Sequence, residues 1–189
     1  RRSARHLRLG GQGVTLRTVR RGGAYHRVAD PAWSEPLDGR HAQRQGGRWN
    51  PPASFPVVYL NADPGTARAN VALRFAGRPF APEDLDPEEA PLLVSTEVPE
   101  DAYVDVVTAA GGTAAGLPAS YPRDARRRRI PHARCQRIGQ QAWDAGHPGV
   151  ACRSAAPGAP PGAEELAWFA RGAALSPTRV QRFDEWFWS

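Results

Sequence analysis

The sequence contains no lysine and no methionine, so all 25 of its basic residues are arginines. The excess of arginine, alanine, glycine and proline is typical of high-GC coding, and much of the arginine content is therefore genomic background. The formal net charge of +6 still favours anionic partners, such as a dinucleotide, an acidic protein or nucleic acid. Charge alone does not choose among these three classes.

Cysteine is also scarce, with only Cys135 and Cys152 in the chain. Neither a CxxC motif nor a Cys/His zinc pattern is present, so no metal site is expected. We find no signal-peptide pattern and no apolar run near 18 residues, which argues against a membrane protein. These observations predict a reduced, cytoplasmic protein, with a structural disulfide as the alternative.

The length of 189 residues predicts one domain with room for a real core. Hydrophobic residues make up 41% of the chain and include six tryptophans, which argues against wholesale disorder despite 19 glycines and 19 prolines. Residues 1–12 are rich in arginine and glycine, with little periodicity, and are predicted to form a flexible arm. Residues 13–189 are predicted to form the domain.

The most informative stretch runs from Gly46 to Phe75 and predicts a loop, a strand and a helix in that order. The glycine pair permits a tight turn or a close approach to a ligand, and Arg48 beside it can present a planar guanidinium to a phosphate or carboxylate. The apolar run Pro56–Leu60 predicts a buried strand that ends near Tyr59. Asp63 followed by proline then predicts a helix start, with Asn70 on the border of the buried face.

The remaining elements complete an α+β domain with a mixed or antiparallel sheet and a few helices. A loop is predicted over Asp30–Gln45, with exposed His41, because Pro31 and Pro36 interrupt any regular element. The last two apolar stretches, Glu164–Phe169 and Arg179–Trp188, are expected to close the sheet, and whether the second is strand or helix stays open. Further strands are predicted over Val14–Val19, Tyr25–Ala29, Pro91–Val98, Tyr103–Val107 and Gly149–Ser154, and a further helix over Ala133–Asp144.

The spacing of Arg48, Tyr59 and Asn70, followed by the motif around Ser154, resembles the RES-domain family, whose members include NAD-degrading toxins of bacterial toxin–antitoxin pairs. The opening strand with Arg27 is similar to that of the family as well. The resemblance covers residues 24–155, the core, and leaves 156–189 as a C-terminal extension. It implies an ADP-ribosyltransferase-like fold, NAD as substrate or ligand, and an acidic antitoxin-like protein as partner. The chain departs from the family at Asn70, where the family has glutamate.

Cleavage of the nicotinamide–ribose bond passes through an oxocarbenium-like state, which a nearby carboxylate stabilises. The resemblance implies that Arg27 and Arg48 hold the pyrophosphate, that Tyr59 packs on the nicotinamide, and that Ser154 supplies a ligand-binding hydroxyl. Asn70 offers hydrogen bonds but no negative charge. Glu164 and Glu165 are therefore candidates for the catalytic carboxylate, although a glutamate pair can also be a polar strand start.

Three functions are consistent with these residues. The first is an NAD glycohydrolase or phosphorylase, with ADP-ribosyl transfer to a macromolecule as the adjacent chemistry. The second is a catalytically weakened relative that binds NAD or a nucleotide as a regulator, and the third is a protein-interaction module. The run Arg126–Arg129 is interpreted as a solvated loop, because no other feature supports a nucleic-acid interface.

Overall fold

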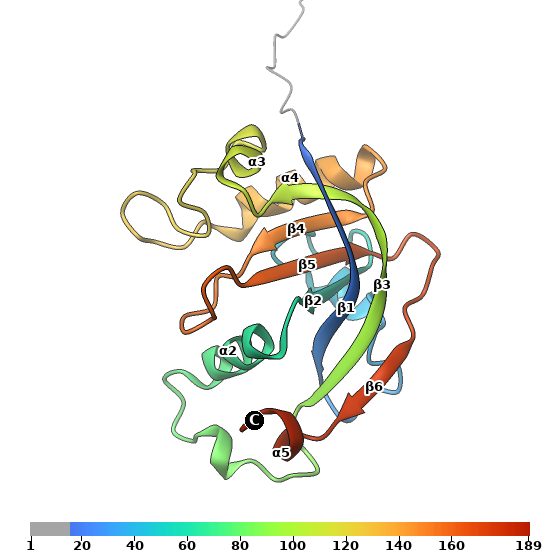
Figure 1. The fold of residues 1–189 in the computed structure, drawn as a ribbon, viewed down its shortest axis with the longest axis vertical. Helices are drawn as coiled ribbons and strands as arrows, with labels where there is room; N and C mark the ends of the chain where they lie inside the picture. The colour runs from blue at the N-terminus through green and yellow to red at the C-terminus, as the bar shows by residue number, and fades with distance from the viewer. Residues whose placement is uncertain (1–15) are drawn as a thin grey trace, which may run out of the picture.

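The computed structural model describes residues 16–189, and the predicted arm over residues 1–12 lies outside the described residues. The described chain is one α+β domain, as the sequence predicts (Figure 1). Its strands are β1 (Thr18–Ala29), β2 (Val57–Asn61), β3 (Leu92–Val106), β4 (Gly149–Arg153), β5 (Glu164–Phe169) and β6 (Pro177–Gln181). Its helices are α1 (Arg40–Gln45), α2 (Pro64–Phe75), α3 (Ala109–Ala114), α4 (His132–Asp144) and α5 (Phe183–Trp186), and a 3-10 turn spans Pro82–Asp84.

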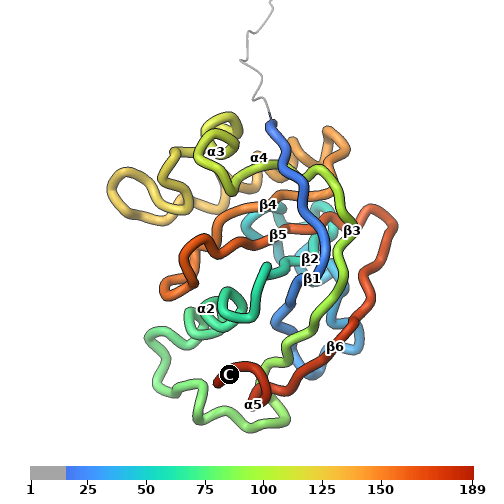
Figure 2. Tube along the Cα trace, viewed as in Figure 1, coloured from blue at the N-terminus to red at the C-terminus, as the bar shows by residue number. Residues whose placement is uncertain are grey.

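Five of the strands form a closed ring. The sheet order is β1-β2-β5-β4-β3-β6, and an additional pairing between β1 and β3 joins the two ends of the first five strands. Only the β3–β4 pair is parallel. In Figures 1 and 2, β1 and β3 run side by side along the molecule, and β2, β4 and β5 run across it. The stretch 156–189, predicted as an extension of the core, contributes β5 between β2 and β4.

The two longest strands correct the sequence prediction. One strand was expected on either side of Gly22–Gly23, and one on either side of Pro99. Instead, β1 and β3 are continuous strands that run through these residues. A register shift between Arg21 and Gly23 accommodates the irregularity, as a β-bulge does. A side chain at Gly22 would meet Glu100 Cα at 2.6 Å, so close pairing requires glycine there.

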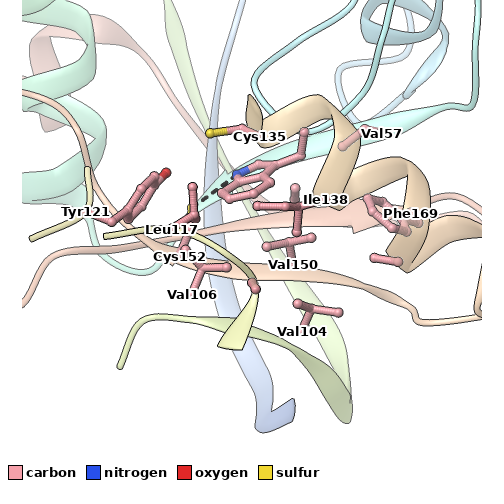
Figure 3. Close-up of a cluster of buried hydrophobic side chains, with 14 of the residues drawn as sticks. Val57, Val104, Val106, Leu117, Tyr121, Cys135, Ile138, Val150, Cys152 and Phe169 are labelled. Atoms are coloured by element: carbon pink, nitrogen blue, oxygen red, sulfur yellow. Dashed lines mark hydrogen bonds between the residues drawn. The ribbon is translucent and has the colours of Figure 1, made fainter. Parts of the chain in front are cut away.

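The buried side chains form three clusters, which follow from the alternation of the strands. The first fills the ring and draws on all five of its strands, with Tyr25, Leu60, Val94, Ala151 and Trp168 among its members. The second covers the outer face of the ring under α4, where Cys135 and Ile138 face Val150 and Phe169 (Figure 3). The third packs α2 and α5 against β1 and β3. Helices α2, α4 and α5 therefore pack against the outside of the ring, which the β1–β3 pairing closes.

Helix α2 begins as the sequence predicts. Asp63 is the N-cap, and its carboxylate accepts hydrogen bonds from the Thr66 backbone N–H at 2.8 Å and the Thr66 hydroxyl at 2.6 Å. Pro64 occupies the first turn, where its missing N–H has no intrahelical partner to lose. The fixed start of α2 determines which of its residues face β1 and β2.

Two short helices were not predicted. The loop expected over Asp30–Gln45 ends at Gly39, after which α1 forms, because both prolines of the segment lie before that point. Helix α3 lies in a segment for which no helix was predicted, and the Thr108 hydroxyl caps it by accepting a hydrogen bond from Gly111 N–H. The C-terminal stretch that stayed open is a strand followed by a short helix, β6 and α5. Within residues 16–189, no helix has the length and apolar character needed to cross a membrane.

Candidate active site

A cleft of about 550 Å³ opens beside the ring, where β1, β2 and α2 meet the loop that follows α1. It brings together Arg27, Arg48, Tyr59, Asn70 and Glu165, which the sequence had placed on five different elements or loops. A volume of this size is within the range of small-molecule sites. The cleft is also lined by Val28, Trp33, His41, Ala42, Gly46, Gly47, Leu60, Asn61, Leu73, Arg74, Arg129 and His132.

Arg48 is presented from a rigid turn. The Gly47 N–H donates to the Asn50 carbonyl at 2.9 Å, which closes the turn around Arg48 and Trp49. The Asn50 side chain is fully buried and donates to the Ala42 carbonyl at 2.7 Å. Trp49 is also buried, and its indole N–H donates to Cys152 Sγ at 3.3 Å. The buried contacts of Trp49 and Asn50, the two residues after Arg48, thus fix the backbone from which its side chain extends.

Tyr59 braces the same turn with its hydroxyl. Its O–H donates to Asn50 Oδ1 at 2.8 Å, and its oxygen accepts from the Trp49 N–H at 2.8 Å. Burial raises the pKa of the Tyr59 hydroxyl, so the group is neutral at physiological pH. The hydroxyl is engaged by the protein, which leaves the ring rather than the O–H as the part that lines the cleft.

The two glycines of the turn serve different purposes. Gly46 has a φ of 75°, a left-handed conformation that other residues adopt only with strain. Gly47 makes room for Tyr59, because a Cβ there would lie 2.3 Å from the tyrosine oxygen. The sequence predicted a tight turn or a close approach to ligand, and the structure adds the close approach of an aromatic ring.

The guanidinium of Arg48 is incompletely paired. Its Nη1 is buried, and no acceptor for it is found among residues 16–189. A buried donor without an acceptor is unfavourable by about 1–3 kcal/mol, and by more when the group is charged. A ligand oxygen bound in the cleft would supply the missing acceptor.

Arg27 also lines the cleft and is only 6% exposed. Its Nη1 donates to the Asp38 carbonyl at 2.9 Å, and its guanidinium lies 5.1 Å from the centre of the Trp33 ring. Burial lowers the pKa of Arg27 to about 10, with Arg74 acting in the same direction and Asp38 opposing it. The guanidinium is still charged at pH 7, although burial disfavours its charged form. An anion bound beside it would stabilise that form.

Glu165 supplies the only carboxylate among the residues that line the cleft. Its Oε1 accepts hydrogen bonds from the Ser154 hydroxyl at 2.6 Å and from Asn70 Nδ2 at 2.9 Å. Asn70 Nδ2 also donates to Asn61 Oδ1 at 2.9 Å. Ser154, predicted to contact ligand directly, thus lies behind the carboxylate and outside the lining of the cleft.

Glu164 lies on the other face of β5. Successive residues of a strand point to opposite faces, so Glu164 shares its face with Leu166 and Trp168. These two side chains are buried in the interior of the ring. Its carboxylate forms a two-point ion pair with Arg21, with distances of 2.7 and 2.9 Å. The prediction of Glu164 as a catalytic residue is therefore corrected, because its carboxylate does not reach the cleft.

Sequence reasoning missed three ionisable residues of the cleft. Arg74 is one helical turn beyond Asn70, a spacing that places both on one side of α2. Arg129 belongs to the arginine run that was interpreted as solvated, and it is exposed while lining the cleft. His132 starts α4, and burial, with help from Arg48 and Arg129, lowers its pKa. No local sequence signal marks Arg129 or His132, since only the tertiary fold brings them to the cleft.

Four arginines thus face one glutamate in this cleft. Such a lining attracts anions, and arginine is well suited to phosphate because its fork of donors matches phosphate oxygens. Within the described chain, no three side chains of His, Cys, Asp or Glu gather to hold a metal ion. The arrangement can bind a phosphate-bearing molecule and place one carboxylate beside it.

Comparison with known proteins agrees with this geometry. The RES domain family pattern matches residues 24–188. The chain is 33% identical over 114 residues to the NAD(+) phosphorylase MbcT of Mycobacterium tuberculosis (strain ATCC 25618 / H37Rv) and equally to that of Mycobacterium bovis (strain ATCC BAA-935 / AF2122/97). Each alignment covers 59% of this chain and 57% of the relative, so it spans little more than half of these proteins.

The fold is also similar to a solved structure, the M. tuberculosis MbcT-MbcA toxin-antitoxin complex. The TM-score is 0.71 with 25% sequence identity, and the match covers 91% of this chain and 92% of that one. The predicted α+β class with a mixed sheet and several helices is confirmed by this agreement.

Proposed function

The chain belongs to the RES domain family, and on that premise we propose that it binds NAD in the cleft and cleaves the nicotinamide–ribose bond. The observation that carries the proposal is the lining of the cleft, in which four arginines surround a single carboxylate. Arginines bind a pyrophosphate, and a carboxylate stabilises the oxocarbenium-like state of glycosidic cleavage. The names of the relatives, NAD(+) phosphorylase, point to the same bond.

We assign the binding roles from the positions of the side chains. Arg27 and Arg48 both line the cleft and hold the two phosphates. Arg48 contributes its Nη1, for which the described part of the chain offers no acceptor, and Arg27 contributes a buried charge. The ring of Tyr59 lines the same cleft and packs against the nicotinamide. Ser154 acts through Glu165 rather than on the ligand.

Inorganic phosphate is the acceptor that we propose for the ribosyl group. Arg74 and Arg129 add positive charge to the cleft beyond the two arginines assigned to the pyrophosphate, and a second anion would use it. The product is then ADP-ribose 1″-phosphate, whereas water as acceptor would give ADP-ribose. Transfer to a macromolecule requires the same cleavage and differs only in the acceptor.

An acidic, antitoxin-like protein is the partner that we propose. Arg123 and the run Arg126–Arg129 are exposed and lie close to the cleft, whose lining includes Arg129. A similar structure is that of a toxin in complex with its antitoxin. Because NAD is an intracellular cofactor, we place the activity in the cytoplasm.

Thermal unfolding tests whether NAD binds. NAD at a hundredfold excess over its Kd stabilises a protein by about 2.7 kcal/mol, which for a domain of this size raises the Tm by roughly 5–11 °C. We expect that shift by differential scanning fluorimetry. Nicotinamide riboside, which lacks both phosphates and the adenosine, is the control and should shift the Tm much less. Equal shifts from the two compounds, or none from NAD, would contradict binding through the arginines.

A further inference from the structure

We infer that the catalytic charge of this site resides on strand β5, at Glu165, and that Asn70 of α2 and Ser154 after β4 act as its positioning residues. The inference rests on the proposed cleavage of NAD. It goes further by naming the group that faces the reacting ribose carbon and the two that orient it. The residues of α2 that line the cleft are Asn70, Leu73 and Arg74, none of them acidic, so the negative charge comes from strand β5.

The hydrogen bonds around Asn70 determine how its amide is oriented. Asn61 donates its Nδ2 to the His26 carbonyl at 3.1 Å, so its Oδ1 is turned toward Asn70 as an acceptor. Asn70 Nδ2 then lies between two acceptors, Asn61 Oδ1 and Glu165 Oε1, each at 2.9 Å. The opposite orientation would place an oxygen against two oxygens. Both amide hydrogens of Asn70 are therefore used within the protein.

One oxygen of Glu165 is held and the other is available. Oε1 accepts from both Asn70 and Ser154, and within the described residues no donor is found for Oε2. Glu165 lines the cleft, and its strand partner Asn61 lines it too. Two hydrogen bonds to a single oxygen fix the plane of the carboxylate, which leaves Oε2 to face the ligand. This is the arrangement that preorganised electrostatic catalysis requires.

The chemical step balances without a further cofactor. The bond between the ribose C1′ and the pyridinium nitrogen breaks, and both electrons stay with the nitrogen, so nicotinamide leaves as a neutral molecule. Positive charge develops at C1′ and is stabilised by Glu165 Oε2. An oxygen of phosphate or water forms the new bond to C1′, and the proton that it carried goes to solvent.

The test compares two adjacent glutamates. Glu165→Gln keeps the shape and can still accept both hydrogen bonds, so the fold and NAD binding are retained while the charge is lost. We expect kcat for nicotinamide release to fall by about 10²–10³-fold with little change in KM. Glu164→Gln, on the opposite face of the same strand, is the matched control and should keep its kcat.

Ser154 tests the positioning role. Ser154→Ala removes one of the two donors to Oε1, and we expect kcat to fall by roughly tenfold at unchanged KM, as for the loss of a charge-assisted hydrogen bond. Ser154→Thr retains the hydroxyl and should recover most of the rate. An alanine variant with the kcat of the unmodified protein would overturn the positioning role.

The outcomes separate this inference from the proposed function. If the unmodified protein releases nicotinamide and Glu165→Gln does so at the same rate, only the assignment of the charge to Glu165 is overturned. If the unmodified protein binds NAD but releases none, the proposed cleavage itself fails. Loss of release in Glu165→Gln alone, with Glu164→Gln active, supports the inference.

Discussion

Arg48→Ala is expected to weaken NAD binding by about 30-fold or more while leaving the protein folded. Removal of one partner from a buried, charge-assisted contact typically costs about 2–5 kcal/mol, and each 1.4 kcal/mol is tenfold in Kd. The fold should tolerate the change, because the Nη1 of Arg48 has no acceptor within residues 16–189. Titration calorimetry with NAD measures the affinity, and the Tm without ligand reports the fold.

Two variants show whether the effect is specific to Arg48. Arg179→Ala removes an exposed arginine on β6, outside the cleft, and should leave the affinity within about twofold, as for a screened surface charge. Arg48→Lys keeps the charge but loses the planar fork, so an intermediate affinity is expected. An Arg48→Ala protein that binds NAD as tightly as the unmodified chain would refute the assignment of the cleft.

Gly139→Ala should destabilise the protein although it places a better helix former in α4. Alanine is favoured over glycine in a helix by about 1 kcal/mol. At this position, however, a Cβ would lie 1.7 Å from the Trp49 carbonyl oxygen and 2.7 Å from its carbon. Both are backbone atoms of the turn that carries Arg48, so either the turn or the helix must shift. Such overpacking typically costs about 1–3 kcal/mol or more, and we expect it to outweigh the propensity.

The same substitution should also reduce the affinity for NAD. Helix α4 holds the turn through Gln136, whose Nε2 donates to the Gly47 carbonyl at 2.9 Å, as well as through the contact at Gly139. Urea unfolding and calorimetry measure the two effects. Gln141→Ala, at an exposed position of the same helix, should leave both unchanged or raise stability slightly. A Gly139→Ala protein as stable as the unmodified chain would contradict the packing described for the turn.

Local sequence signals predicted the part of the fold that carries the site. Asp63 and Pro64 specify a helix start through hydrogen bonding and a fixed φ, and both act as predicted. The strand before them was predicted from a short apolar run that is buried on both faces of the ring wall. In each case the residues involved are neighbours in the sequence.

Long-range pairing overrode the local signals elsewhere. Gly22, Gly23 and Pro99 usually interrupt strands. Here β1 and β3 pair along most of their length, and a register shift accommodates the irregularity. The short helix α1 was not predicted, because the two prolines before it indicated a loop over the whole segment. The errors in the strands concern where elements end, which local propensity specifies least well.

The residues of the site were predicted only in part, because some of them reach the cleft only through long-range pairing. Arg27, Arg48, Tyr59 and Asn70 were named from the sequence, and all four line the cleft. Choosing between Glu164 and Glu165 required the register of β5, since Glu165 pairs with Asn61 and Glu164, the residue before it, points to the opposite face. Arg129 and His132 join the cleft only through the path of the chain before α4. No local pattern marks them.

The most direct test of the account is nicotinamide release from NAD by the unmodified protein, followed by chromatography with and without inorganic phosphate. We predict release, with phosphate in the reaction giving ADP-ribose 1″-phosphate as the second product. Release that is independent of phosphate and yields only ADP-ribose would identify water as the acceptor. NAD left intact after prolonged incubation with folded protein would contradict the central claim that this cleft cleaves the nicotinamide–ribose bond.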